Sequence, residues 1–409
     1  MKVDVRQLIL SVARAVDLVG IDDVMHGRRV AVIAVEIAKR MGWDRATQQL
    51  LFDAGLVHDC GVSSTRVHRT LVDELDWADA HLHCEKGYAL LKDFPPMGHL
   101  APIVLYHHTH WDELSKTRCD PMTALLANLV YLSDRVDVQA ASCMGSESPL
   151  LAVAPIRETI ARYRGTFFAP EIVDAFLTAS APEAFWLRLT QDYIPEYVAE
   201  MQQAESCRYV GYDELKRFAL IIAEIVDAKS HFTKEHSLGV ARLARRLAQM
   251  AGFTGERLGE IEVAALLHDI GKLQVPDEVL DSPAKLSTME RAVIMKHSYA
   301  TWQILRRIGG LGEVARWASE HHESMSGHGY PFRIEGHEIP MESRIIKVAD
   351  VYQALAQTRP YRRSLPAAEI LTMLRGMEAE NEVDGKLVDL VAANLAVCQD
   401  AAVGAPAAA

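Results

Sequence analysis

The chain has 409 residues, 49% of them hydrophobic, and a formal net charge of −12. This length suits two or three domains with a large apolar core, which excludes wholesale disorder. The acidic balance argues against a nucleic-acid polymer as partner, because such binding needs a basic field to displace counterions, whereas a small phosphate ligand needs only a local positive site.

The amino-terminal segment MKVDVRQLILSVARAVDLVG carries too many charges for a secretion signal. The sequence has no run of about 18 apolar residues, so we expect no membrane span and no membrane partner. Its cysteines form no CxxC pair and are expected to be reduced and mostly buried. They are Cys60, Cys84, Cys119, Cys143, Cys207 and Cys398. A cytoplasmic protein fits these features.

Helical periodicity dominates the chain, and one stretch of it occurs twice. The segment HGRRVAVIAVEIAKRMGW begins at His26, and the similar segment HSLGVARLARRLAQMAGF begins at His236. A His-Asp pair follows 32 residues after each first histidine, at His58-Asp59 (26 to 58) and at His268-Asp269 (236 to 268). Equal spacings with similar flanks indicate a duplicated helical module.

The apolar pattern after His236 supports this interpretation. Apolar residues fall at i, i+3, i+4 and i+7, which is one face of a helix, and a glycine follows as a helix stop. These residues are Val240, Leu243, Ala244 and Leu247, with Gly252 as the stop. The segments FFAPEIVDAFL and PEAFWLRLTQDYIPEYVAEMQQ between the two copies are predicted to be packed helices.

We therefore predict an all-α fold with two tandem helical domains, each a bundle around a His/Asp metal site. The predicted domains are residues 1–205 and residues 206–397, and residues 398–409 are predicted to form a flexible tail.

Imidazoles and carboxylates recur in a fixed order in the second half. The candidate ligands are His236, His268, Asp269, His297, His321, His322 and Asp350. Such ligands suit iron, manganese, nickel or zinc. Seven of them indicate two divalent ions sharing a carboxylate, a geometry that clamps the attacking and leaving oxygens in phosphoryl displacement. Asp269 is the candidate bridge, and Lys272 can place a positive charge beside a phosphate oxygen.

At this point the sequence resembles the HD superfamily of metal-dependent phosphohydrolases, and more narrowly its HD-GYP branch. The matching stretches are HDIGK from His268, KHSYATWQIL from Lys296, HHESMSGHGYP from His321, and RIIKVADVYQAL followed by TRPYRR. The resemblance covers roughly residues 212–395, and the combination of these motifs at these distances is specific.

The resemblance implies hydrolysis of cyclic di-GMP to linear pGpG and in some members to GMP, while other members prefer 3',3'-cyclic GMP-AMP. It implies that the seven residues above hold metal and that Lys272 and Asp269 are catalytic. Gly329, Tyr330 and Pro331 match the GYP loop of the substrate pocket. Arg359 and Arg362 fall where the family places basic residues near substrate phosphates. Phe232 stands where three-metal members carry Glu, so two metals are expected, and family habit implies a homodimer.

The first half aligns with the same pattern as a divergent HD domain. Its candidate metal ligands are Asp22, His26, His58, Asp59, His83, His107, His108 and Asp134. Val62 takes the place of the active-site lysine, and the segment after His108 has no GYP. The retained ligands favour a second metal site with a regulatory or dimerising role, and the alternative is a relic whose histidines merely pack.

Other functions remain open at this stage. Another HD phosphohydrolase could act on nucleoside phosphates or on ppGpp, although the GYP loop and the doubled histidines argue against it. A metal-loaded but catalytically weak cyclic-dinucleotide receptor is a second alternative, which the intact Lys272 disfavours. A purely structural helical scaffold would leave the ordered histidines unexplained.

Overall fold

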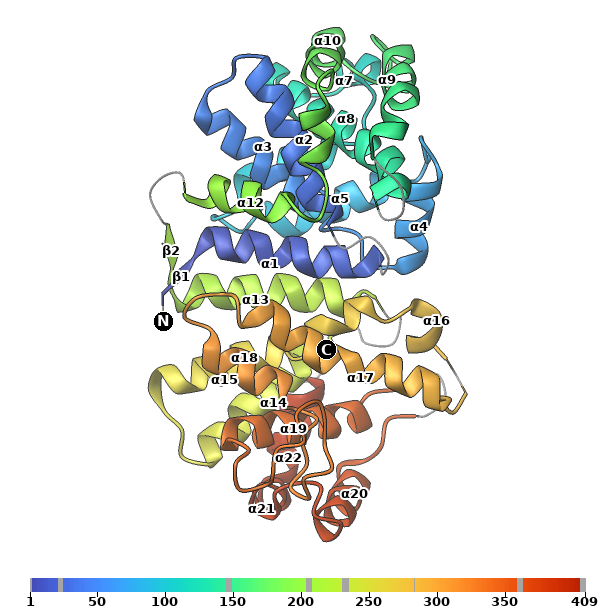
Figure 1. The fold of residues 1–409 in the computed structure, drawn as a ribbon. Helices are drawn as coiled ribbons and strands as arrows, with labels where there is room; N and C mark the ends of the chain where they lie inside the picture. Colours follow the sequence, from blue (N-terminus) through green and yellow to red (C-terminus); the bar gives the residue numbers. More distant parts are fainter. Residues whose placement is uncertain are drawn as a thin grey trace. The chain divides into compact units, whose positions relative to one another are not determined.

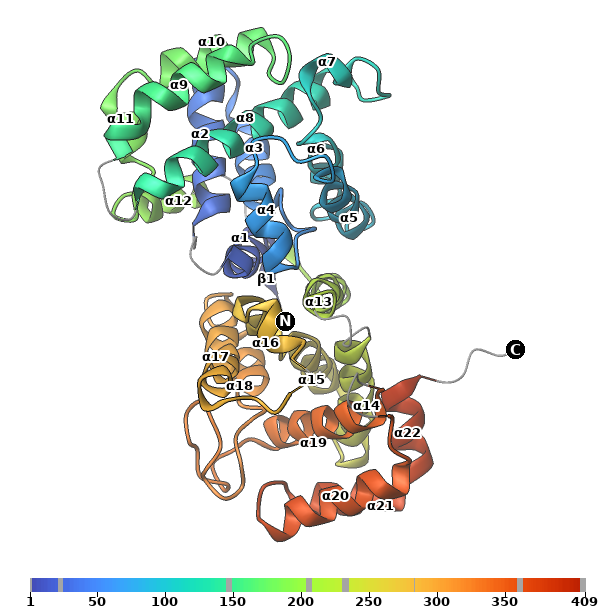
Figure 2. The ribbon, with the colours of Figure 1, turned by 90° about the vertical axis from the view of Figure 1, so that its right-hand side faces the viewer.

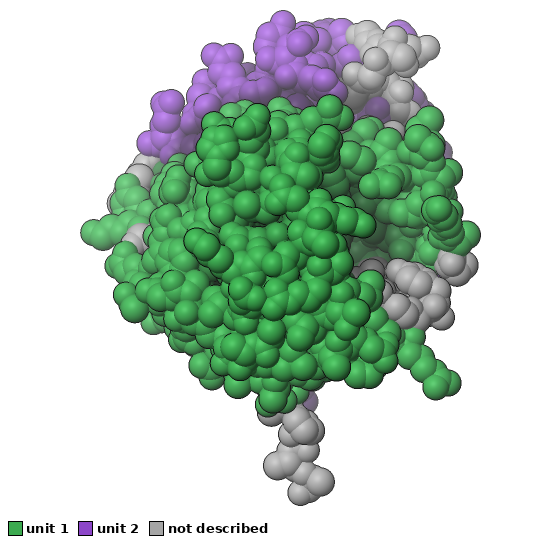
Figure 3. All heavy atoms as spheres, turned by 90° about the horizontal axis from the view of Figure 1, so that it is seen from below, with its two compact units in different colours: residues 1–8, 209–409 green, residues 9–208 purple. Residues whose placement is uncertain are grey.

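The computed structural model describes residues 2–20, 25–144, 149–203, 208–229, 235–282, 284–358 and 363–404. The chain separates into two compact units, residues 9–208 and residues 1–8 with 209–409 (Figure 3). Both units are built from helices (Figures 1 and 2), which confirms the all-α prediction. None of the described helices combines the length and the hydropathy needed to cross a lipid bilayer.

The elements of the first half of the chain, drawn in blue to green in Figure 1, have the following bounds: β1 (Val3–Asp4), α1 (Val5–Asp17), η1 (Leu18–Gly20), α2 (His26–Arg40), α3 (Arg45–Val57), α4 (Thr65–Asp73), α5 (His81–Leu91), η2 (Gly98–Leu100), α6 (Ala101–Tyr106), α7 (Trp111–Leu114), α8 (Pro121–Met144), η3 (Pro149–Ala152), α9 (Val153–Arg162), α10 (Pro170–Ala179), α11 (Glu183–Leu187) and α12 (Ile194–Gln203).

The elements of the second half, drawn in yellow-green to red, are β2 (Tyr209–Val210), α13 (Tyr212–Asp227), α14 (His236–Met250), α15 (Gly255–Leu267), η4 (Ile270–Gln274), α16 (Asp277–Leu280), α17 (Thr288–Leu305), α18 (Gly312–Ser319), α19 (Met341–Ala356), α20 (Ala367–Ala379), α21 (Gly385–Ala393) and α22 (Leu395–Val403).

The duplication is visible in the helix bounds. Helices α2 and α14 each have 15 residues, helices α3 and α15 each have 13, and each pair begins and ends 210 residues apart. In one unit α2 packs against α3 and α8, and in the other α14 packs against α15 and α19 (Figure 2). The two units therefore repeat one helical framework.

Apolar periodicity explains why these helices form the cores. Val240, Leu243, Ala244 and Leu247 of α14 are all fully buried, as their spacing predicts. The helix ends at Met250, and Gly252 adopts the left-handed conformation that only glycine accepts without strain. In the other unit the predicted helices α10, α11 and α12 are present, and each buries part of its apolar face, including Phe176, Trp186 and Ile194.

The boundary at the amino terminus differs from the prediction, which assigned residues 1–205 to one domain. Strand β1 pairs antiparallel with β2, with Val3 opposite Val210, and the Gln7 side chain accepts a hydrogen bond from the Gly309 amide at 2.6 Å. The first eight residues therefore belong to the unit that contains residues 209–409. A strand of two residues has no periodicity by which the sequence could reveal it.

The carboxyl-terminal segment also differs from the prediction of a flexible tail at 398–409. Helix α22 continues to Val403, with Cys398 and Ala402 buried, because its apolar residues pack against α14 and α19. Residues 405–409 lie outside the described residues. The described cysteines are free thiols, and Cys60, Cys84 and Cys398 are buried as expected. The side chains of Cys143 and Cys207 are outside the described part.

A glycine after each His-Asp pair lets two segments of backbone approach closely. A Cβ built on Gly271 would lie 2.0 Å from the carbonyl oxygen of His297 in α17. At Gly61 the same Cβ would lie 2.0 Å from the carbonyl oxygen of His83 in α5. In both units a glycine therefore sets the distance between the His-Asp turn and the helix that carries the next histidine.

We predict that Gly271→Ala lowers the free energy of unfolding by about 2 kcal/mol or more, because overpacking costs about 1–3 kcal/mol and here the obstacle is backbone. Urea unfolding measures this change. Gly376→Ala is the matched control: Gly376 lies inside α20 with nothing within 4 Å of an added Cβ, so alanine should stabilise by up to about 1 kcal/mol. Equal effects of the two variants would contradict the close-approach argument.

Candidate metal centre

The seven candidate ligands of the second half come from five helical elements. His236 is the first residue of α14, His268 caps the end of α15 with Asp269 next to it, and His297 lies in α17. His321 and His322 follow α18, and Asp350 lies in α19. Their ligand atoms form three overlapping groups, within each of which all atoms lie within 4.8 Å of one another. The groups are His297 with His321 and His322, His236 with His268 and Asp350, and His268 with Asp269 and His321.

The Asp269 carboxylate lies between two sets of imidazoles. Its Oδ1 is 3.5 Å from Nε2 of His297 and 3.9 Å from Nε2 of His321. Its Oδ2 is 3.1 Å from Nε2 of His268 and 3.6 Å from Nε2 of His236. Each oxygen thus faces a different pair of rings, which is the arrangement that a bridging ligand requires.

Backbone carbonyls set the orientation of the rings. The Nδ1 atoms of His268, His297 and His321 lie 2.7, 2.6 and 2.7 Å from the carbonyl oxygens three residues earlier in the chain. The Nδ1 of His236 instead pairs with the side-chain oxygen of Gln353. With Nδ1–H donating, Nε2 keeps its lone pair and points to the centre, as in protein metal sites.

Burial and neighbouring charges shift the pKa values of these groups in opposite directions. Burial lowers the pKa of His297 to about 4, and it also holds the pKa values of His321 and His322 well below the usual range. Burial disfavours charge on Asp269, but His268 and Lys272 hold its pKa well below the usual range. Burial likewise opposes charge on His236, yet contacts with Asp269 and Asp350 raise its pKa to about 9.

Three buried atoms at the centre have no hydrogen-bond partner in the described structure: Nε2 of His236, Nε2 of His268 and Oδ1 of Asp269. An unpartnered buried polar atom costs about 1–3 kcal/mol, so such atoms are rare without a ligand. Imidazole and carboxylate are donors that iron, manganese, nickel and zinc accept. The residues present therefore fit a bound metal.

Lys272 and Tyr330 border the centre. The ammonium group of Lys272 contacts Oδ2 of Asp269. The lysine side chain is 25% exposed, so its positive charge remains accessible to solvent. The ring of Tyr330 stacks on His322, with centroids 4.7 Å apart and planes 25° from parallel. Arg359 and Arg362, predicted to hold phosphates, lie outside the described residues, as do Phe232 and Asp22.

Glu323 shapes the connection that follows the GYP motif, and it was not among the predicted site residues. The carboxylate of Glu323 accepts hydrogen bonds from the backbone amides of Phe332 at 2.7 Å, Arg333 at 3.2 Å and Ile334 at 3.0 Å. A Cβ on Gly329 would lie 2.4 Å from the Ser324 amide nitrogen, so only glycine fits there. Glu323 directly follows the pair His321-His322 in the sequence, and this position was the one signal that could have indicated its role. Two further neighbours of His236 gave no sequence signal: Gln353, which contacts its Nδ1, and Asp227, which accepts hydrogen bonds from Ser237.

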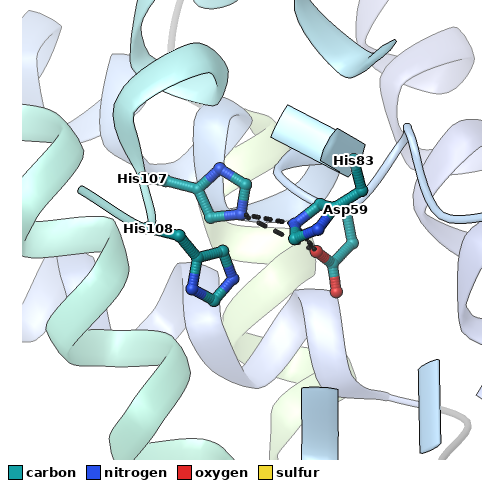
Figure 4. A group of neighbouring side chains, drawn as sticks. All are labelled: Asp59, His83, His107 and His108. Carbon is teal, nitrogen blue, oxygen red and sulfur yellow. Dashed lines mark hydrogen bonds and ion pairs between the residues drawn. The ribbon is translucent and has the colours of Figure 1, made fainter. Parts of the chain in front are cut away.

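The first half assembles the same constellation. Oδ1 of Asp59 lies 3.2 Å from Nε2 of His83 and 3.7 Å from Nε2 of His107. Its Oδ2 lies 3.5 Å from Nε2 of His58 and 3.7 Å from Nε2 of His26. Figure 4 shows His83 and His107 converging on Asp59, with His108 beside them. Asp134 completes the set at 3.3 Å from His26.

The surroundings of this second constellation are different. Two arginine guanidinium groups are buried there, and the equivalent sequence positions of the other unit hold no arginine. Arg135 binds Oδ2 of Asp134, and Arg29 binds Asp137, whose Oδ2 lies 2.8 Å from Nδ1 of His26. Val351 and Gly239 stand at the positions equivalent to the two arginines.

Comparison with known proteins finds an HD domain in each of the two units. HD-domain family models match residues 24–139 and residues 219–387. The chain is 34% identical over 396 residues to the 3'3'-cGAMP-specific phosphodiesterase 1 of Vibrio cholerae, covering 96% of this chain and 92% of that protein. It is 38% identical over 137 residues to the cyclic di-GMP phosphodiesterase response regulator RpfG of Xanthomonas campestris, covering 31% of this chain and 36% of that protein.

A solved structure shares the fold. The crystal structure of a cyclic GMP-AMP-specific phosphodiesterase of Vibrio cholerae, V-cGAP3, superposes with a TM-score of 0.66 over 99% of both chains, at 23% sequence identity. At this identity the likeness shows the fold, which spans both helical units.

We predict that Glu323→Ala loosens the loop at residues 329–334, because three backbone amides lose a charged acceptor, and lowers the free energy of unfolding by about 2 kcal/mol. Hydrogen-deuterium exchange of the loop peptide measures the change. The control is Glu335→Ala, whose side chain is exposed and which lies in the same connection. Unchanged protection of the loop in Glu323→Ala would contradict the assigned role.

Proposed function

The chain belongs to the HD-GYP family of the HD superfamily as a tandem HD-domain protein, and we propose that its second unit uses metal to hydrolyse a phosphodiester bond of a cyclic dinucleotide. The observation that carries this proposal is Asp269, whose two oxygens face separate pairs of imidazoles. The likeness to a phosphodiesterase over 96% of the chain supports it.

Two groups of residues would hold the metals. One ion would lie among His297, His321, His322 and Oδ1 of Asp269. The other would lie among His236, His268, Asp350 and Oδ2 of Asp269. Bound divalent ions of iron, manganese, nickel or zinc supply Lewis acidity and lower the pKa of bound water, which suits phosphodiester hydrolysis at neutral pH.

The remaining residues position and neutralise the substrate. Lys272 presents a positive charge beside Asp269 and offsets negative charge that grows on a phosphate oxygen. Tyr330 stacks on His322 and fixes the orientation of that ring at the edge of the site. Arg359 and Arg362 are proposed to hold the phosphates, a task for which the planar guanidinium fork is suited.

Two substrates have support. Cyclic di-GMP, cleaved to linear pGpG and in some family members on to GMP, is favoured by the GYP motif and by relatives named cyclic di-GMP phosphodiesterases. 3',3'-cyclic GMP-AMP is favoured by the relative that matches nearly the full chain, which is named as specific for it. The first unit lacks the lysine and the GYP loop, so we assign hydrolysis to the second unit alone.

Asp269→Ala is expected to remove both metals of the second unit together with turnover, because it takes a ligand from both positions. Metal analysis and chromatography of products from both cyclic dinucleotides, on anaerobically purified protein, measure this. Asp192→Ala, at an exposed carboxylate, is the control and should match the unaltered chain. Hydrolysis at the normal rate by Asp269→Ala would refute the proposal, and binding without any product from the unaltered chain would favour a receptor.

Lys272→Met is expected to keep the metal content and reduce kcat about 100-fold, because one positioned charge at a phosphoryl centre contributes about that factor. The matched control is Lys285→Met, an exposed lysine in the connection before α17. Steady-state kinetics with metal analysis of the same samples separates the two effects. If Lys272→Met lost metal as completely as Asp269→Ala, its role would be structural.

A further inference from the structure

We infer that the first unit holds a single metal ion, at Asp59, His83, His107 and His108, and that the buried guanidinium of Arg135 takes the place of a second ion. The inference concerns residues 9–208 alone. It therefore does not depend on the substrate or the activity of the second unit.

The four named residues form the larger of the two candidate groups in this unit. Their ligand atoms all lie within 4.8 Å of one another (Figure 4), and three of the four residues are buried. Oδ1 of Asp59, which faces His83 and His107, is a buried atom without a hydrogen-bond partner in the described structure. The equivalent atom of the second unit, Oδ1 of Asp269, has the same property.

The other half of the constellation differs between the units. In the first unit, Nε2 of His26 and Nε2 of His58 lie 3.3 Å apart at hydrogen-bond distance, so each ring nitrogen has a partner. In the second unit, the equivalent Nε2 atoms of His236 and His268 are both buried and unpartnered. The same contact joins His83 and His107 at 3.2 Å in the half assigned to the ion, so the charged neighbours of Asp134 decide between the halves.

In the half of the site that contains His26 and His58, the carboxylate of Asp134 already binds a buried cation, the guanidinium of Arg135. Nε and a terminal nitrogen of Arg135 lie 3.0 and 2.7 Å from Oδ2 of Asp134, and both side chains are 2% exposed. Two like charges at such distances repel strongly when water is excluded. An ion at His26, His58 and Asp134 would have to share Asp134 with this guanidinium, whereas Asp350 has Val351 beside it.

The same arginine closes the site. Its other terminal nitrogen donates to the carbonyl oxygens of Leu71, Glu74 and Leu75, at and beyond the end of α4. The side chain of Asp134 is 2% exposed, whereas that of Asp350 is 14% exposed. Closed sites with a full set of protein ligands are typical of structural metals, and catalytic sites keep an open position. The four ligands of the proposed ion are themselves 9% exposed or less, so this ion would tie α5 to the segments that follow α3 and α6 and would take no substrate.

Metal counting on the full chain tests this. The second site is emptied by replacing His236, His268, Asp269 and His321 with alanine, the protein is loaded with manganese, and bound metal is measured by mass spectrometry. About one ion per chain should remain, as a closed four-ligand site predicts. No remaining ion, or two, would overturn the inference. Since turnover is not measured, an inactive second unit leaves the result unaffected.

Single replacements in that background locate the ion. His107→Ala should remove it, whereas His26→Ala should leave it bound, and equal loss in both would overturn the assignment.

Arg135→Val, which introduces the residue that the second unit has at this position, should raise the number of bound ions from about one to about two per chain, as in the two-ion site of the second unit. The electron paramagnetic resonance spectrum of the manganese-loaded Arg135→Val variant should change from that of an isolated manganese ion to that of a coupled pair. An unchanged count would refute the role given to Arg135, and Arg162→Val, at an exposed arginine, is the control.

Discussion

A buried carboxylate surrounded by imidazoles is the constraint on which this structure depends. Asp269 is almost fully removed from water, keeps its charge and has one oxygen without a hydrogen-bond partner in the described structure. Such a group is costly in a protein interior unless a cation compensates it. Histidines from α14, α15, α17 and the segment after α18 meet at this carboxylate, and Asp350 of α19 contacts His236, so the site and the fold require the same packing.

Much of this site could be predicted from sequence because its ligands lie at helix ends and in short motifs. The spacing of 32 residues between His236 and His268, repeated from His26 to His58, indicated the duplicated framework, and the structure places both sets around an aspartate. Helical periodicity predicted the buried face of α14, because burial on one side of a helix leaves a regular pattern.

Other features left no such pattern. Glu323 shapes the connection that follows the GYP motif through three backbone amides, and Arg135 binds carbonyl oxygens about 60 residues earlier in the chain. These contacts join single side chains to irregular backbone, so neither periodicity nor propensity reveals them. The pairing of β1 with β2 is too short to show alternation, and α22 has the small, apolar composition that the sequence analysis assigned to a tail.

The duplicated units place the same framework of histidines and aspartates in two different surroundings. Both keep an aspartate that faces four imidazoles and the glycine after it, but one has a lysine and the GYP loop and the other a buried arginine. Anomalous diffraction from a crystal of the metal-loaded chain tests the central claim most directly. The account predicts two anomalous peaks in the second unit, one beside each oxygen of Asp269. Peaks that lie away from Asp269, or a single peak bound by only one of its oxygens, would contradict it.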